Sequence, residues 1–212
     1  MALVAALAGS SNQADCADYV VDRARSEFVV TLSKGGIAAA LAHNHAIRAA
    51  EFTGEAVFDP ADLGNAMLWV RAQTGSLVAD EPDVRRRYGL SRSIGERDRR
   101  KIQETMLSAS QMDAAKYPTM EFRSTSVEKR PEGQYLVTGN LSIHGVERPV
   151  AFPVTLEEED GALRVRATIA FRQSDFGIKP YSAMLGAVRN KDEAVLNIEI
   201  FAIPSTLAEE TE

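Results

Sequence analysis

Apolar and polar residues alternate along most of this chain, a pattern typical of β-strands that bury one face. The alternation is clearest at 135–143, where every second residue from Tyr135 to Ile143 is apolar or glycine. The segments 150–157 and 162–172 have the same period of two. In each segment we expect one face in the protein core and the other in water.

Further strands are expected in five segments of similar composition, at 26–33, 50–59, 66–73, 119–128 and 194–203. With the three segments above they make at least eight strands, each separated from the next by turn residues or a loop. Asp160-Gly161 is a hairpin signal, so the strands on either side of it should be adjacent and antiparallel. Because closure removes exposed strand edges, the pattern predicts a closed antiparallel barrel.

One segment has a helical period instead. Ile102 and Met106 lie four residues apart, and Ser93 and Glu96 match a capping box at a helix start. We therefore expect one short helix over about 94–108, inserted between two strands.

Composition narrows the class of protein. With 212 residues, 45% of them hydrophobic, the chain can bury a sizeable core, and β-barrels of this length form one domain. The net charge of −6 at pH 7 repels phosphate backbones, so nucleic acid is not an expected partner. Cys16 is the only cysteine, which excludes an intrachain disulfide. No stretch approaches the roughly 20 apolar residues of a transmembrane helix.

The chain divides into three parts. We expect a flexible N-terminus at 1–18, a barrel domain at 19–204 and an acidic tail at 205–212. The start, MALVAALAGSSNQADC, combines a short apolar run with small residues, as a truncated signal peptide would. No positive charge precedes this run, so the segment is a weak secretion signal.

Four motifs resemble the YceI-like family of lipid-binding, lipocalin-like proteins. They are FTGEAVFDP at 52–60, RDRRKIQETMLSASQMDAAKYPTMEFRST at 97–125, VTGNLSIHGVERPVAFPV at 137–154 and FRQSDFGI at 171–178, in the family's order. The chain departs from the family pattern at AHNHAI, residues 42–47, and at 78–95, which resembles an expanded loop.

The resemblance implies a mainly β fold: an extended eight-stranded antiparallel barrel with one short inserted helix. It also implies a non-catalytic protein that carries or sequesters a polyisoprenoid, such as an isoprenoid quinone or a prenyl pyrophosphate, and that needs no cofactor. A barrel of this size either fills its interior or holds one ligand, and each buried methylene gains about 0.8 kcal/mol. The family implies the bacterial periplasm, whereas the weak signal leaves the cytoplasm open. Monomer and homodimer both remain open.

The residues expected to line the interior are the large apolar ones of the predicted strands, because alternation assigns them to the core. They are Phe28, Val30, Phe52, Phe58, Trp69, Met120, Phe122, Leu141, Phe152 and Phe171. Alternation does not decide whether they close into a solid core or leave a tunnel.

His43 and His45 are the candidate residues for the barrel mouth. Residues two apart project from one face of a strand, so the pair could also bind a metal or haem, which is the alternative function. A third ligand would have to come from His144, Glu51 or Asp22, and an incomplete set favours a polar mouth.

Strand parity also weighs against a metal site inside the barrel. If one strand runs unbroken from 43 to 52, both histidines share the face of Glu51, whereas Phe52 points the other way. A turn near 48–50 would remove this argument. His144, followed by Gly145, is interpreted as a residue at a hairpin end and not as a catalytic group.

A basic run is the last candidate. It comprises Arg85, Arg86, Arg87, Arg92, Arg97, Arg99, Arg100 and Lys101. Such residues can hold anionic lipid head groups or a pyrophosphate. A solvated helix and loop is the preferred interpretation, because Asp80, Glu81, Asp83 and Glu104 lie beside them.

Overall fold

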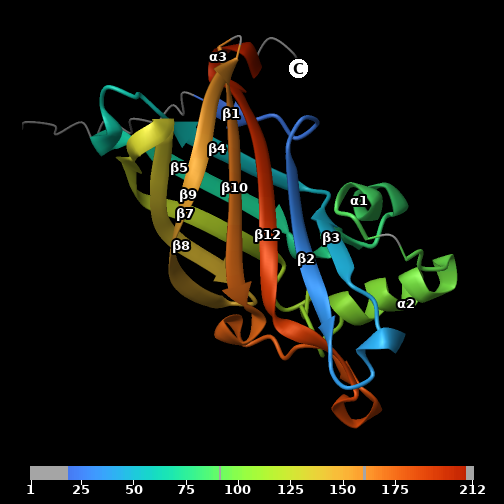
Figure 1. Ribbon diagram of the computed structural model, residues 1–212. Coiled ribbons are helices and arrows are strands. Elements are labelled where there is room, and N and C mark those ends of the chain that lie inside the picture. The colour runs from blue at the N-terminus through green and yellow to red at the C-terminus, as the bar shows by residue number, and fades with distance from the viewer. Residues whose placement is uncertain (1–18, 91, 160, 209–212) are drawn as a thin grey trace, which may run out of the picture.

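The computed structural model describes residues 19–90, 92–159 and 161–208 (Figure 1). Its strands are β1 (Tyr19–Val21), β2 (Glu27–Gly35), β3 (His45–Ala49), β4 (Phe52–Val57), β5 (Met67–Gln73), β6 (Leu77–Ala79), β7 (Thr119–Lys129), β8 (Gln134–Ile143), β9 (Val146–Glu159), β10 (Ala162–Arg172), β11 (Ser182–Ala183) and β12 (Val188–Pro204). Its helices are α1 (Pro82–Arg87), α2 (Glu96–Leu107) and α3 (Ser205–Ala208). All strand pairs are antiparallel, as predicted for the barrel.

The sheet closes into a barrel of eight antiparallel strands, which confirms the predicted fold class. Three of these strands are each broken in two, so β1 continues into β2, β3 into β4, and β5 into β6. The joined β1 and β2 pair with β12 on one side, and with β4 and β3 on the other. The ring then runs through β5, β7, β8, β9 and β10 back to β12. The eight segments expected to be strands are β-strands, and β1, β3, β6 and β11 were not predicted.

The break between β3 and β4 changes which residues face the interior. Ala50 donates its N–H to the Ser76 carbonyl at 3.2 Å, and Gln73 donates to the Glu51 carbonyl at 2.9 Å. The two-residue break shifts the alternation by one position, so Ala49 and Phe52 are both buried. The parity argument that separated the histidines from Phe52 therefore does not hold.

The barrel has two distinct ends (Figure 1). The α3 end carries α3, β1 and the β4–β5, β7–β8 and β9–β10 connections. Residue 160 of the predicted β9–β10 turn, like residues 1–18 and 209–212, lies outside the described residues. The α2 end carries α2, the β2–β3 loop and the segment between β10 and β12, whereas α1 packs on the outer face of β2 and β3. Residues 205–208, expected as part of an acidic tail, form the helical turn α3.

The predicted helix is confirmed as α2, but the capping box is wrong. Helix α2 begins at Glu96 with Gly95 as its N-cap, and no side chain caps it. Glu96 is thus the first helical residue instead of the third and cannot reach back to Ser93. The expected loop at 78–95 also contains a second helix, α1, with Pro82 at its start, where proline is favoured.

Helix α2 covers the edge of β6 through one side chain. The Gln103 amide accepts from the Ala79 N–H at 2.8 Å and donates to the Leu77 carbonyl at 2.6 Å. These two bonds satisfy backbone groups that a terminal strand would otherwise leave unpaired.

Among the described helices, none is both long and apolar enough to cross a bilayer.

Candidate functional site

The interior of the barrel is partly hollow. A cavity of about 180 Å³ is lined by residues of β2, β3, β5, β6, β7, β8, β9, β10 and β12, and by Met106 of α2. Glu121 and Gln173 are the only polar residues of its lining; the rest are aliphatic, methionine or phenylalanine. An apolar interior of this kind suits a ligand held by dispersion and burial instead of by hydrogen bonds.

Seven of the ten residues that the sequence assigned to the interior line this cavity. They are Phe28, Val30, Met120, Phe122, Leu141, Phe152 and Phe171. The register explains why they meet, because Phe122 pairs with Leu141 across β7 and β8, and paired residues share a face. Whether they bind a ligand stays a prediction.

Phe52 and Phe58 are core residues that do not line the cavity. The ring of Phe52 packs edge-on against Phe28 with centroids 4.8 Å apart, in the cluster that also contains Leu77 and Met106. The ring of Phe58 packs edge-on against Tyr135 at 5.5 Å. It belongs to the cluster around Leu163 that fills the α3 end.

Trp69 corrects one prediction, because it lies on the outer face of the barrel. It pairs with Glu55 and Arg123 in the sheet, and its ring contacts the guanidinium groups of Arg71 and Arg123 at 5.0 and 5.4 Å. Its neighbours Leu68 and Val70 line the cavity instead. The prediction followed the size of the side chain, whereas parity within β5 decides its face.

The cavity extends toward the α2 end through residues that the prediction did not include. Met106 of α2 and the loop residues Met112, Gln173 and Ile178 lie there. The buried Gln173 donates its amide N–H to the carbonyl oxygens of Lys191 at 2.9 Å and Asp192 at 3.3 Å. The helical period of α2 indicated that Met106 faces the barrel. No periodic pattern in the sequence includes Met112, Gln173 or Ile178.

A buried ionic cluster joins the insertion to the barrel at the α2 end. The Asp80 carboxylate accepts hydrogen bonds from His45 Nδ1 at 2.7 Å, the Ala46 N–H at 3.1 Å and Arg85 at 2.6 Å. Arg85 also donates to the carbonyl oxygens of Asn44 at 2.7 Å and Arg92 at 2.6 Å. His45 is thus engaged in holding the loop that follows β6.

The cluster keeps Asp80 ionised. Burial disfavours its charged form, but the hydrogen bonds from His45, Ala46 and Arg85 outweigh this effect, so the pKa of Asp80 lies below its usual 3.8. A carboxylate and a guanidinium buried together stabilise each other only as an intact set, because either one alone would be an unpaired buried charge.

His43 lies near the same cluster. Its buried Nδ1 has no hydrogen-bond partner among the described residues. Burial lowers the pKa of His43 below its usual 6.5, and the positive charge of Arg92 lowers it further. His43 and His45 thus lie at the α2 end, as a mouth position requires, but neither lines the cavity.

The metal alternative gains no support from the geometry. The described residues contain no group of three histidine, cysteine, aspartate or glutamate side chains placed to hold one ion. His144, one proposed third ligand, forms the β8–β9 turn with Gly145 and packs its ring 4.3 Å from that of Tyr117. This confirms its interpretation as a hairpin-end residue. A side chain at Gly145 would meet the Tyr117 ring at 2.5 Å, so the turn needs glycine there.

The basic run divides into residues with different roles. Arg85 is buried in the ionic cluster, which corrects the expectation that the whole run is solvated. Arg86 and Arg100 form exposed ion pairs with Asp83 and Glu96 on their own helices. Arg87 pairs with Glu27 of β2.

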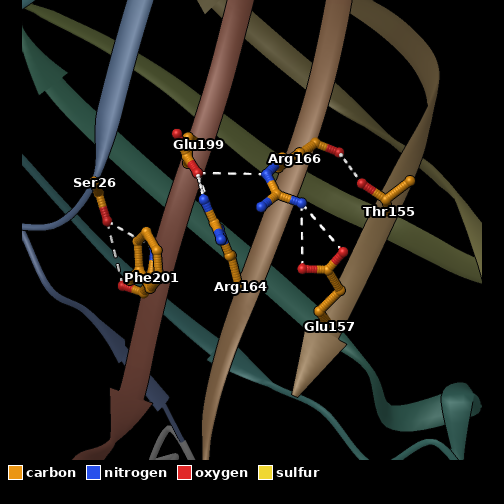
Figure 2. A network of polar contacts seen from close by, with 7 residues as sticks. All are labelled: Ser26, Thr155, Glu157, Arg164, Arg166, Glu199 and Phe201. Carbon is orange, nitrogen blue, oxygen red and sulfur yellow. Dashed lines mark hydrogen bonds and ion pairs between the residues drawn. The ribbon is translucent and has the colours of Figure 1, made fainter. Parts of the chain in front are cut away.

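The outer face of β9, β10 and β12 contrasts with the cavity wall on the same strands (Figure 2). Glu199 accepts from Arg164 at 2.5 and 3.0 Å and from Arg166 at 3.4 Å. Arg166 also donates to both carboxylate oxygens of Glu157 at 3.2 Å. Alternation placed these arginines outside, and the structure confirms it.

Comparisons with known proteins agree with this architecture. The family model described as YceI-like domain matches residues 19–202. A UPF0312 protein of Pseudomonas putida strain W619 is 30% identical over 176 residues, which cover 80% of this chain and 81% of that protein. A UPF0312 protein of Shewanella baltica is 28% identical over 188 residues, covering 84% and 87%.

Two solved structures share the fold at low sequence identity. BcnA of Burkholderia cenocepacia has a TM-score of 0.64 at 18% identity, covering 85% of this chain and 98% of its own. A polyisoprenoid binding domain from Saccharophagus degradans, implicated in plant cell wall breakdown, has a TM-score of 0.58 at 12% identity, covering 89% and 99%.

Proposed function

Because the chain belongs to the YceI-like domain family, we propose that it carries or sequesters a long apolar molecule, a polyisoprenoid, inside the barrel. The observation that carries this proposal is the cavity, whose lining has only two polar residues, Glu121 and Gln173. Burying a hydrocarbon chain there gains about 0.8 kcal/mol per methylene without any directed contact. Binding and release are the whole activity, so no bond is made or broken and no cofactor takes part.

The choice of a polyisoprenoid over other apolar ligands is supported by the Saccharophagus degradans domain, whose fold this chain shares. The cavity of about 180 Å³ is narrow, so it admits a single chain and has to widen for a long one. The methionines Met106, Met112 and Met120 suit such widening, because their unbranched side chains adapt to new shapes.

The ligand's polar head would lie at the α2 end. There the cavity reaches Gln173 and Ile178, and the α3 end is filled by the cluster around Leu163. Exposed cations of α2, such as Arg97 and Lys101, are available to an anionic head group. The relatives are bacterial proteins, and the proposed site of action is the periplasm.

Native mass spectrometry of protein purified without detergent tests the proposal, followed by solvent extraction and mass analysis of the released molecule. We expect a stoichiometric isoprenoid. Ala167, whose β10 position lines the cavity, offers the decisive variant, because Ala167→Phe fills the space the ligand needs. Its bound mass should be lost while the barrel stays folded by circular dichroism.

Thr168→Phe is the matched control, since it adds the same ring one position away on the exposed outer face. It should keep the ligand in full. Protein without any extractable lipid, or an Ala167→Phe variant that binds as much lipid as Thr168→Phe, would contradict the proposal.

A further inference from the structure

Large exposed apolar side chains gather at one place on the molecule. Among the described residues six such side chains are exposed, and five of them lie on two loops at the α2 end: Ile37, Leu41, Tyr181, Met184 and Leu185. We call residues 36–42 and 181–187 the apolar tip. Isolated exposed apolar residues are ordinary, but a cluster of this kind marks an interaction surface.

The two loops form one surface because the backbone joins them. The Ala38 N–H donates to the Ala187 carbonyl at 2.8 Å and so joins the two loops, and the Asn190 N–H closes the second loop by donating to the Tyr181 carbonyl at 2.9 Å. Gly36 allows this approach, since a side chain there would lie 2.4 Å from the Ala187 oxygen. In Figure 1 the two loops lie side by side beyond the lower end of the sheet.

The most exposed part of the tip is also strained. Met184 and Leu185 have φ angles of 52° and 55°, in the left-handed region that large side chains rarely adopt. Their exposed fractions are 66% and 109%, so no burial within the barrel compensates for this conformation. Backbone strain that no packing within the fold compensates is typical of functional segments.

The charge of the tip differs from that of the whole protein. The segments 34–44 and 177–191 contain Lys34, Lys179, Arg189 and Lys191 but no acidic residue, although the chain carries a net charge of −6. The side chains of Arg189 and Lys191 lie together beside Gly35. The next residue, Asp192, is held by the Ser174 hydroxyl and N–H. The tip is therefore an apolar surface flanked by cations.

We propose that the apolar tip inserts into the surface of an anionic lipid bilayer. Ile37, Met184 and Leu185 would enter the boundary between head groups and acyl chains, and the flanking cations would contact lipid phosphates. Tyr181 suits the same boundary, where aromatic residues with one polar end are favoured. The charge selects this occupant, because a net negative protein approaches an anionic bilayer only through a cationic face.

The tip lies at the end of the barrel toward which the cavity extends. The wall residue Ile178 lies three residues before the tip segment that starts at Tyr181. Docking would therefore bring the hollow end of the barrel to the membrane. The docking itself does not depend on the proposed ligand, so the two can fail separately.

Co-sedimentation of the full chain with vesicles tests the proposal. We expect binding to vesicles of mixed phosphatidylcholine and phosphatidylglycerol, and much weaker binding to pure phosphatidylcholine or at high salt. Met184→Asn combined with Leu185→Asn should reduce binding by about tenfold or more, because both apolar contacts are lost. Asparagine tolerates positive φ, so this variant does not strain the loop further.

Charge variants and matched controls complete the test. Arg189→Gln and Lys191→Gln should each weaken binding by about fivefold. Leu207→Asn and Lys129→Gln, which change exposed residues at the α3 end, should bind as the unmodified chain does. Mass spectrometry of the same samples reports bound lipid, so loss of ligand is not mistaken for loss of docking.

Three outcomes would overturn the proposal. The unmodified chain does not bind anionic vesicles, the Met184→Asn, Leu185→Asn variant binds them equally well, or the controls lose binding to the same extent as the tip variants. A dimer in solution that the tip variant abolishes, without vesicle binding, would assign the tip to a second copy of the chain instead.

Discussion

The two ends of the barrel are built from the same eight strands but are completed in different ways. The α3 end is filled by Leu163 and Ala202, with Phe58 and Tyr135 packed ring against ring beside them. The α2 end is hollow, and it is covered by an insertion that Asp80 and Arg85 fasten to β3. The α2 end has buried residues of its own, such as Phe176 and Ile178, but it also keeps the space and the loops that binding needs.

Breaking the ionic cluster should have the largest effect on this arrangement. Asp80→Asn keeps the shape and the positive φ of 58° but leaves Arg85 as a buried charge without its counter-ion. We expect the free energy of unfolding to fall by about 3–5 kcal/mol, measured by urea denaturation. Increased proteolysis at 80–95 would place the loss in the insertion.

Asp83→Asn is the control, since the ion pair of Asp83 with Arg86 is exposed and its loss should cost less than about 1 kcal/mol. The pH dependence of the free energy of unfolding tests the direction of the Asp80 pKa shift. Because the pKa of Asp80 is lowered on folding, its stabilisation is present above 3.8 and is lost as the pH falls through the lower folded value. An Asp80→Asn variant as stable as Asp83→Asn would contradict the role of the cluster.

Truncating one side chain at each end compares how much free energy of unfolding the packing contributes there. Leu163→Ala removes a buried side chain from the filled end and should cost about 2–5 kcal/mol. Met112→Ala removes a half-buried side chain that already borders empty space, so about 1 kcal/mol is expected. Thermal and urea unfolding of both variants measure the difference.

Ligand binding should show the reverse order. Met112→Ala changes the cavity wall and should alter the amount or the chain length of the extracted lipid, whereas Leu163→Ala should leave both unchanged. Equal losses of stability at the two sites would mean that the α2 end is packed as tightly as the α3 end.

The smallest expected effect is the pH dependence of stability that His43 contributes at the α2 end. Its pKa is lowered on folding, so below pH 6.5 the unfolded chain binds more protons than the folded chain. Stability should therefore fall as the pH drops from 6.5 through the folded pKa, and His43→Asn should remove this part of the dependence. An NMR titration of the His43 ring that gives a pKa above 6.5 would contradict the sign.

Much of the fold could be predicted from local pattern. Alternation assigned the buried face of β8 from Tyr135 to Ile143, and the spacing of Ile102 and Met106 located α2. Alternation failed where the backbone breaks, because the two residues between β3 and β4 shift it by one position, and this break exists only in the paired sheet. The short strands β1, β3 and β6 also lack the length that periodicity needs.

The candidate site was less predictable for a related reason. Phe122 and Phe152 follow from parity, whereas Trp69 was wrongly placed inside because size was weighed above parity. The bond between His45 and Asp80 joins residues 35 positions apart, and only tertiary structure brings them together. The hollow itself depends on how side chains pack, and composition contains no signal for that.

The single amide of Gln103 has a consequence for how the chain folds. Strand β6 stands at the end of the sheet order, and Gln103 satisfies its outer edge at Leu77 and Ala79. Until α2 docks during folding, that edge can pair with the same edge of another chain. The yield of refolding at high protein concentration thus depends on how quickly one glutamine reaches its strand.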